Sequence, residues 1–233
     1  YDAQLPGVNM HGGLSILAAQ DKSPRVDFLA GYSVTDLSKI KPLFPQKKMG
    51  KVLYSWLTHA FVSGRVASGT MLWRGPLSGF PYLDHSGHFE VLGAVRNLDF
   101  HYLDRWPDML HTDAKLLFDN RSMYADLLAG SLNGMQVKTG KAVIKNMQYA
   151  HLYIDSKLAG DLNAATGYMR NTPLSVAKTF KAMDLSGPAT LSLHLDLPLK
   201  KQAPPHSSGV VTTAKANLFL KKWKLKKNLW FPL

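Results

Sequence analysis

Asp84, His85 and His88 form the densest group of potentially reactive side chains in the chain. Histidine and aspartate at such short spacings are typical metal ligands. A Ser-Gly pair at 86–87 separates them, however, and this composition is typical of a turn. We therefore interpret the group as a turn that leads into a strand beginning near Phe89, and we predict no metal site.

The sequence lacks the usual motifs of catalysis. It has no cysteine, no Gly-x-Ser-x-Gly nucleophile elbow and no complete phosphate-binding glycine loop. Its sixteen acidic residues are scattered, although carboxylates from distant positions can still meet in space to form an acid/base pair. We predict a protein that is not an enzyme, with no catalytic residues and no cofactor, and keep a hydrolase of an envelope polymer as a distant alternative.

A basic stretch near the end of the chain offers a different chemistry. In an extended strand, Lys222, Lys224 and Lys226 would share one face, and Trp223 and Leu225 the other. Such a face can contact anionic headgroups or nucleic acid phosphates, or it can be a solvated edge that blocks strand pairing. We predict that the three lysines contact an anionic surface, and we expect no nucleic acid partner.

The composition is that of a folded, basic protein. Of the 233 residues 45% are hydrophobic, and 28 basic against 16 acidic residues leave a net charge of +12, which favours anionic partners. No run of about 18 apolar residues could span a bilayer. Because the chain begins at Tyr1 and stops at Leu233 amid apolar residues, we expect an internal piece of a longer protein.

Most hydrophobic residues recur with period two, which is the period of a β-strand. The clearest case is the leucine series at 191, 193, 195, 197 and 199. A second run carries Phe89, Val91 and Val95 and continues, after a shift of one residue, through Leu98 and Phe100. A third predicts a strand over 212–220, and shorter runs predict strands at 12–19, 25–32, 70–74, 114–118, 122–127, 135–137, 141–146 and 151–158. The short separators between these runs indicate antiparallel hairpins.

Helical periodicity is rare. Apolar residues from Met49 to Phe61 recur at helical spacing and predict a helix near 48–62, ended by the Ser-Gly pair at 63–64. Asp161 is a suitable N-cap for the first of two helices predicted near 161–183. We expect one β-rich domain over 1–199, a loop or linker at 200–209, and the truncated start of a further β repeat at 210–233.

A strand with one apolar face has two ordinary explanations. It forms half of a closed core, or it lines an open groove that holds acyl chains. Both bury the same face, so periodicity alone leaves the two open.

Dispersed motifs along the chain resemble the YhdP family of AsmA-like proteins. They are WL at 56–57, FVSGRV at 61–66, GTMLWRG at 69–75, FP at 80–81, GHFEV at 87–91, LDFHY at 98–102, WP at 106–107, FDN at 118–120, GDL at 160–162, TPL at 172–174, GPA at 187–189 and LSLHLDLPL at 191–199. The order and spacing fit the family throughout, but the motifs are structural and carry no catalytic signature.

The resemblance implies a mainly β fold with a few short helices, in which an elongated, twisted antiparallel sheet curls into a groove. It also implies a periplasmic protein, anchored in the inner membrane of a Gram-negative bacterium by parts outside this chain. Such a protein would carry phospholipid towards the outer membrane and maintain the permeability barrier. The main alternative is a scaffolding module for protein partners in the envelope. Under the groove hypothesis we predict that acyl chains contact Phe89, Val91, Val95, Leu98, Phe100, Leu191, Leu193, Leu195, Leu197, Leu218 and Leu220.

Overall fold

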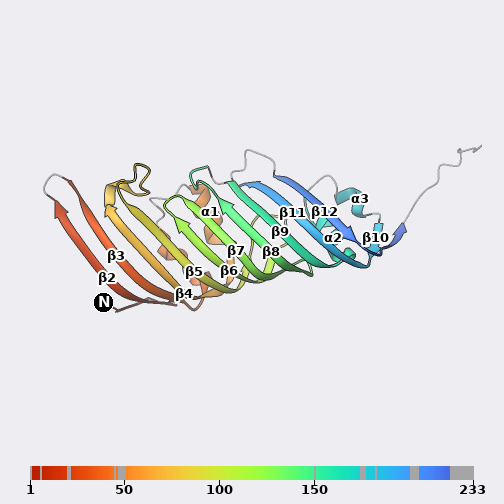
Figure 1. The fold of residues 1–233 in the computed structure, drawn as a ribbon, viewed down its shortest axis with the longest axis horizontal. Coiled ribbons are helices and arrows are strands. Elements are labelled where there is room, and N and C mark those ends of the chain that lie inside the picture. Colours follow the sequence, from red (N-terminus) through yellow and green to blue (C-terminus); the bar gives the residue numbers. More distant parts are fainter. Residues whose placement is uncertain are drawn as a thin grey trace, which may run out of the picture.

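The computed structural model describes residues 2–5, 7–19, 22–44, 46, 51–149, 151–173, 177–181, 183–199 and 205–220. Eleven strands form one antiparallel sheet in which neighbours in sequence are neighbours in space (Figure 1). In order, they are β1 (Asp2–Leu5), β2 (Val8–Ala19), β3 (Lys22–Val34), β4 (Phe61–Pro76), β5 (His88–Phe100), β6 (Met109–Asp119), β7 (Ser122–Leu132), β8 (Met135–Ile144), β9 (His151–Asp161), β11 (Pro188–Pro198) and β12 (His206–Thr213). A separate pair is formed by β10 (Met183–Ser186) and β13 (Asn217–Leu220).

The sheet is elongated, twisted and open. Its long axis runs across the strands, and β1 and β12 form its two edges (Figure 1). The prediction of a mainly β fold, with an antiparallel sheet curled into a groove, is confirmed.

One face of this sheet is mostly apolar. Directly paired residues of antiparallel strands point to the same side, so the register can be followed across the sheet. One such row passes through Ala30, Met71, Val91, Phe118, Met123 and Ile144. Alternate residues on the opposite, outer face include Asp27, Glu90, Lys115 and Asp155. We call the apolar side the inner face.

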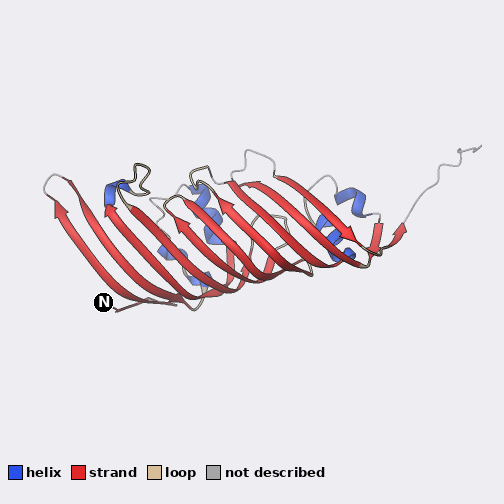
Figure 2. Cartoon of the chain, viewed as in Figure 1, coloured by secondary structure: helices blue, strands red, loops and turns tan. Residues whose placement is uncertain are grey.

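The helices are α1 (Lys51–Ala60), α2 (Leu162–Arg170), α3 (Ala177–Lys181) and the 3-10 turns η1 (Leu37–Lys39), η2 (Lys41–Leu43) and η3 (Leu77–Gly79). Helix α1 lies behind the strands in the view of Figure 2. The Asp161 carboxylate caps α2 by accepting a hydrogen bond of 2.8 Å from the backbone N–H of Asn163, as expected for an N-cap. None of the helices in the described ranges has both the length and the hydrophobicity that a bilayer span requires.

Two predicted boundaries are wrong. The strand expected over 212–220 is broken at a bend, where the Thr213 hydroxyl lies within hydrogen-bonding distance of the carbonyl oxygens of Pro188 and Lys215, and β13 then pairs with β10 instead. The helix near 48–62 ends at Ala60, since the chain from Phe61 onwards pairs with β5. β12 joins the main sheet beside β11, and the division of the chain at 200–209 stays a prediction.

Candidate functional site

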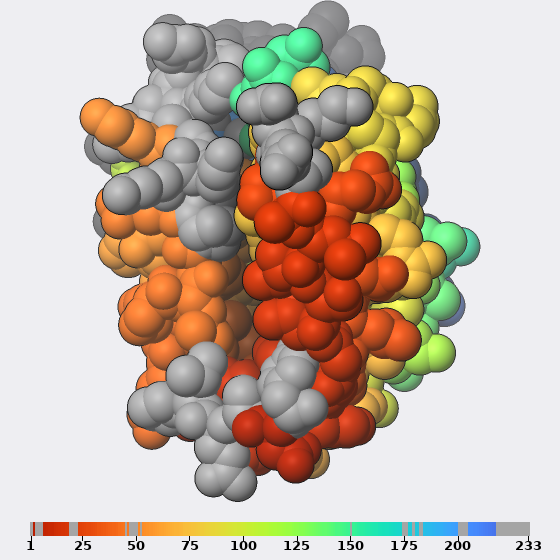
Figure 3. Space-filling model, turned by 90° about the vertical axis from the view of Figure 1, so that its left-hand side faces the viewer, coloured from red at the N-terminus to blue at the C-terminus, as the bar shows by residue number. Residues whose placement is uncertain are grey.

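A cavity of about 1130 Å³ lies between the inner face of β2–β6 and the segments that cover it. At the end of the molecule nearest β2, Figure 3 shows a hollow between the red strands and the orange segment on the other side. Well-packed protein cores contain few voids larger than a water molecule, and ligand pockets usually measure about 300–1,000 Å³. The cavity is therefore large enough to hold an organic molecule of considerable size.

The sheet supplies one wall of the cavity and the helical segments supply the other. Four inter-strand spacings of about 4.8 Å separate β2 from β6, which gives the cavity a length of roughly 19 Å along the sheet. The sheet wall consists of Val8, Met10, Tyr32, Val34, Phe61, Val66, Met71, Trp73, Phe89, Val91, Gly93, Val95, Leu116 and Phe118. The covering wall includes Leu37, Ile40, Leu43, Phe44, Leu53, Leu57, Leu77, Phe80, Pro81, Leu83 and Met147.

The polar part of the lining is small. It consists of the Tyr32 hydroxyl, which donates a hydrogen bond of 2.9 Å to the Leu92 carbonyl, and of Lys51, Asn120, Arg121, Asn146 and Gln148. Desolvation by burial raises the pKa of Tyr32 to about 12, so this group is a neutral phenol at physiological pH. The lining therefore suits a ligand that is mostly apolar and has one polar part.

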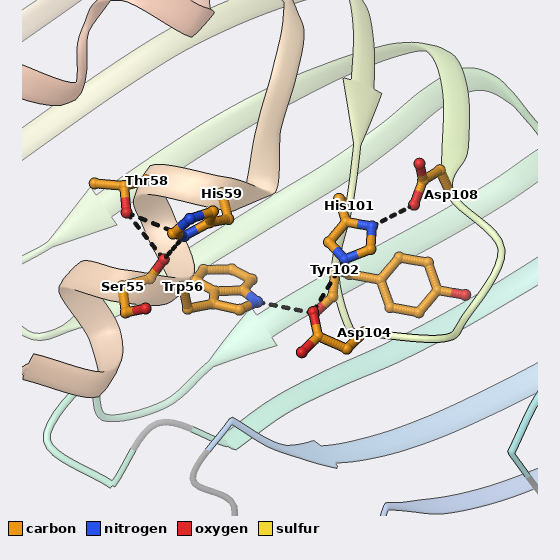
Figure 4. Close-up of polar contacts among 8 residues, drawn as sticks. All are labelled: Ser55, Trp56, Thr58, His59, His101, Tyr102, Asp104 and Asp108. Atoms are coloured by element: carbon orange, nitrogen blue, oxygen red, sulfur yellow. Dashed lines mark hydrogen bonds and ion pairs between the residues drawn. The ribbon is translucent and has the colours of Figure 1, made fainter.

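Five aromatic residues in successive contact extend from α1, beside the cavity, into the packed core over the later strands. Trp56 of α1 meets Phe100 edge to face at 5.8 Å between ring centroids, and Phe100, Tyr102, Trp106 and Tyr168 follow with successive centroid distances of 6.1 to 6.3 Å. The Trp56 indole N–H donates a hydrogen bond of 2.8 Å to the Tyr102 carbonyl (Figure 4). The Tyr102 and Tyr168 hydroxyls lie 3.2 Å apart. We call these five residues the aromatic partition.

His101 helps to hold the loop that carries the partition. Its ring nitrogens lie 2.6 Å from an Asp108 oxygen and 3.3 Å from an Asp104 oxygen (Figure 4). Burial acts to lower the pKa of His101, but the hydrogen bonds with the two carboxylates outweigh it, and the pKa is raised above 6.5. The His101 ring is half-buried and bonded on both sides.

Beyond the partition the inner face is packed closed. Leu191, Leu193, Leu195 and Leu197 of β11 are between 0 and 3% exposed and belong to one core with Trp106, Tyr168 and residues of β6–β9. Each of the four leucines points to the inner face, as the period-two pattern predicts. In this conformation they do not line the cavity.

The other predicted lining residues fall into three groups. Phe89, Val91 and Val95 line the cavity. Leu98 and Phe100 line a much smaller apolar space of about 40 Å³ beside Trp56. The side chains of Leu218 and Leu220, and all of Lys222, Lys224 and Lys226, lie outside the described residues. Lipid contact by any of these residues stays a prediction.

The group around Asp84 is a turn. The Asp84 carboxylate accepts a hydrogen bond of 3.1 Å from the backbone N–H of Ser86, and His85 has a positive φ of 59°. His88 starts β5 and pairs with Glu90 and Asp119 on the outer face instead. In the part of the chain that the structure describes, no three His, Asp or Glu side chains gather in a way that could hold a metal ion.

Several lining residues were not singled out from the sequence. Met71 and Trp73 alternate in the pattern of a strand, and Leu53 and Leu57 share the apolar face of the predicted helix, so a signal was present for each. The fact that this helix forms part of the covering wall, with a space left between it and the sheet, depends on tertiary contacts that periodicity does not reveal.

The family model for the YhdP protein matches residues 2–228. The chain belongs to the YhdP family. One curated relative, the intermembrane phospholipid transporter YhdP of Escherichia coli (strain K12), is 32% identical over 222 residues. The match covers 94% of this chain and 18% of the relative, so the chain spans under a fifth of the length of that YhdP protein. No solved structure matches the chain.

Proposed function

We propose that the cavity between β2–β6 and α1 binds the acyl chains of a phospholipid, as one segment of a lipid path in the bacterial envelope. The observation that carries this proposal is the cavity itself, a space of about 1130 Å³ with a mostly apolar lining. The name of the Escherichia coli relative, an intermembrane phospholipid transporter, supports the choice of ligand.

The dimensions suit an acyl chain. The hydrocarbon core of a bilayer is about 30 Å thick, so the chains of one leaflet extend over about 15 Å. The roughly 19 Å between β2 and β6 accommodates that length. Each methylene moved from water into the cavity contributes about 0.8 kcal/mol, so a chain can be retained without a specific polar contact.

The aromatic partition sets where a bound chain stops. Trp56 and Phe100 pack against the cluster that includes the lining residues Leu53, Leu57 and Val95, and also against the closed core. A lipid in this conformation rests in the first part of the segment. Passage along the inner face towards β11 requires the partition and the packing behind it to move.

At the level of the longer protein, we propose a periplasmic conduit that is anchored in the inner membrane and supplies phospholipid for the outer membrane barrier. The relative's name and its Gram-negative source support this setting. The segment would contribute a stretch of apolar face and no chemical step.

Filling the cavity tests the proposal. Val91 lines the cavity, whereas Leu92, the next residue, is 41% exposed on the outer face. We expect Val91→Trp to reduce the phospholipid that remains bound to the intact native protein in native mass spectrometry, and Leu92→Trp to leave it unchanged. Equal lipid retention in both variants and the wild type would contradict binding in the cavity.

A further inference from the structure

The polar residues of the cavity lining gather mainly on two neighbouring turns. Asn120 and Arg121 form the β6–β7 turn, and Asn146 and Gln148 lie in the β8–β9 connection. β6 and β8 run in the same direction with β7 between them, so the turns that follow β6 and β8 lie at the same end of the strands. We call this end of the strands the hairpin edge. A ligand in the cavity therefore meets apolar side chains along the strands and polar groups at this edge.

Hydrogen bonds hold the two turns together. The Met147 backbone N–H donates to the Arg121 carbonyl at 2.7 Å, and the Ser122 hydroxyl donates to the Lys145 carbonyl at 2.9 Å. Asn120 is fixed to β5, because its N–H donates to the Phe89 carbonyl at 2.8 Å and its side-chain oxygen accepts from the Phe89 N–H at 3.0 Å. These bonds hold the backbones of the two turns, and the Asn120 side chain, next to the apolar wall at Phe89.

The charge of the lining is of one sign. Two cations, Arg121 and Lys51, and three amides contribute to it, whereas none of the described lining residues is a carboxylate. Both cationic side chains are exposed, and within the described ranges neither has an ion pair with an acidic residue. This arrangement complements an anion attached to an apolar chain.

We infer that the edge formed by 120–121 and 146–148, together with Lys51, binds the phosphate of a lipid whose acyl chains occupy the cavity. Arg121 is the principal contact, since a guanidinium can donate two parallel hydrogen bonds to a phosphate. Lys51, on the covering wall, adds electrostatic attraction, and the amides of Asn146 and Gln148 can donate to ester or headgroup oxygens. The lipid is thereby oriented with its headgroup at the hairpin edge.

This inference rests on the proposed function. A comparison of a lipid that carries a phosphate with one that lacks it tests the phosphate site separately from acyl-chain binding in the cavity. We would measure the affinity of the intact native protein for a phosphatidylglycerol and for a diacylglycerol with the same acyl chains. The matched variants are Arg121→Gln, Lys51→Gln and, as control, Lys115→Gln, which removes an exposed cation from the outer face of β6.

For Arg121→Gln we expect about a tenfold loss of affinity for phosphatidylglycerol, which corresponds to about 1.4 kcal/mol, and unchanged affinity for diacylglycerol, because only the first lipid carries the phosphate that the guanidinium would bind. Lys51→Gln should cause a smaller loss of the same kind, and Lys115→Gln none. Unchanged phosphatidylglycerol affinity in Arg121→Gln, or an equal loss in Lys115→Gln, would overturn the phosphate site and leave the proposed function standing. Failure of the wild type to bind either lipid would instead overturn the proposed function.

Discussion

Tyr32 forms part of the cavity wall by lying across two glycines of the neighbouring strands. A Cβ atom at Gly69 would come within 2.4 Å of the Tyr32 ring and 2.5 Å of the Leu92 carbonyl, and one at Gly93 would come within 3.1 Å of the Tyr32 hydroxyl. The missing side chains thus leave room for a flat aromatic surface on the inner face. Glycine in a strand commonly marks such a close approach.

We predict that Gly69→Ala lowers the free energy of unfolding by about 1–3 kcal/mol, because the added methyl group must displace the Tyr32 ring or the backbone. Denaturant unfolding followed by circular dichroism measures this change. Gly13→Ala is the matched control, since a Cβ there meets nothing within 4 Å. It should be neutral or stabilising by about 0.5–1 kcal/mol, and an equal loss in both variants would argue against the contact.

The His101 cluster predicts a specific pH dependence. Because the pKa of His101 is raised in the folded protein, the ion pairs with Asp108 and Asp104 stabilise the fold fully below pH 6.5, and this contribution disappears as the pH rises through the folded-state value. The difference in melting temperature between the wild type and His101→Gln should therefore be larger at pH 6 than at pH 8.5. Asp108→Asn should weaken the same dependence. A difference that grows with pH would contradict the assignment.

At the scale of elements, α1 determines where the interior is open and where it is closed. Its apolar residues Leu53 and Leu57 face the cavity, whereas Trp56 belongs to the partition. The helix thus forms part of the covering wall of the cavity and also contacts the closed core beside it. Its position is fixed through Trp56 and Tyr102, which are 46 residues apart in sequence.

We predict that Trp56→Ala costs about 3–5 kcal/mol in the free energy of unfolding, because it removes a large aromatic side chain from the packed partition. Trp56→Phe keeps a ring but loses the hydrogen bond to Tyr102, and should cost about 1 kcal/mol. Denaturant unfolding gives both values. The exposed Ser55→Ala on the same helix should change stability by less than about 0.5 kcal/mol. A loss below 1 kcal/mol in Trp56→Ala would show that the partition is not a packed barrier.

At the scale of the whole molecule, the period-two pattern of hydrophobic residues predicted the sheet well, because each strand buries one face and exposes the other to solvent. The leucine series of β11 was assigned to the inner face on this signal alone, and each leucine points there. The resemblance to the YhdP family predicted the groove. Neither signal could predict that Val91 lines an open cavity and Leu193 a closed core, because both residues alternate in the same way.

The inner face is open over the earlier strands and closed over the later ones because different segments cover the sheet in these two regions. Tyr102, Trp106 and Tyr168 fill the space over the later strands, whereas α1 and the 3-10 turns leave a space over the earlier ones. The polar edge at Arg121 was likewise hidden in sequence, since a turn with Asn120 at positive φ looks like any hairpin connection.

Site-specific photocrosslinking tests the central claim most directly. Met71 lines the cavity, and its neighbour Leu72 pairs with Glu90 on the outer face. With a diazirine-bearing amino acid at either position of the intact native protein, irradiation in the presence of phospholipid should yield a protein–lipid adduct at position 71 and little at position 72. Equal labelling at the two positions, or labelling at position 72 alone, would contradict a lipid held within the cavity.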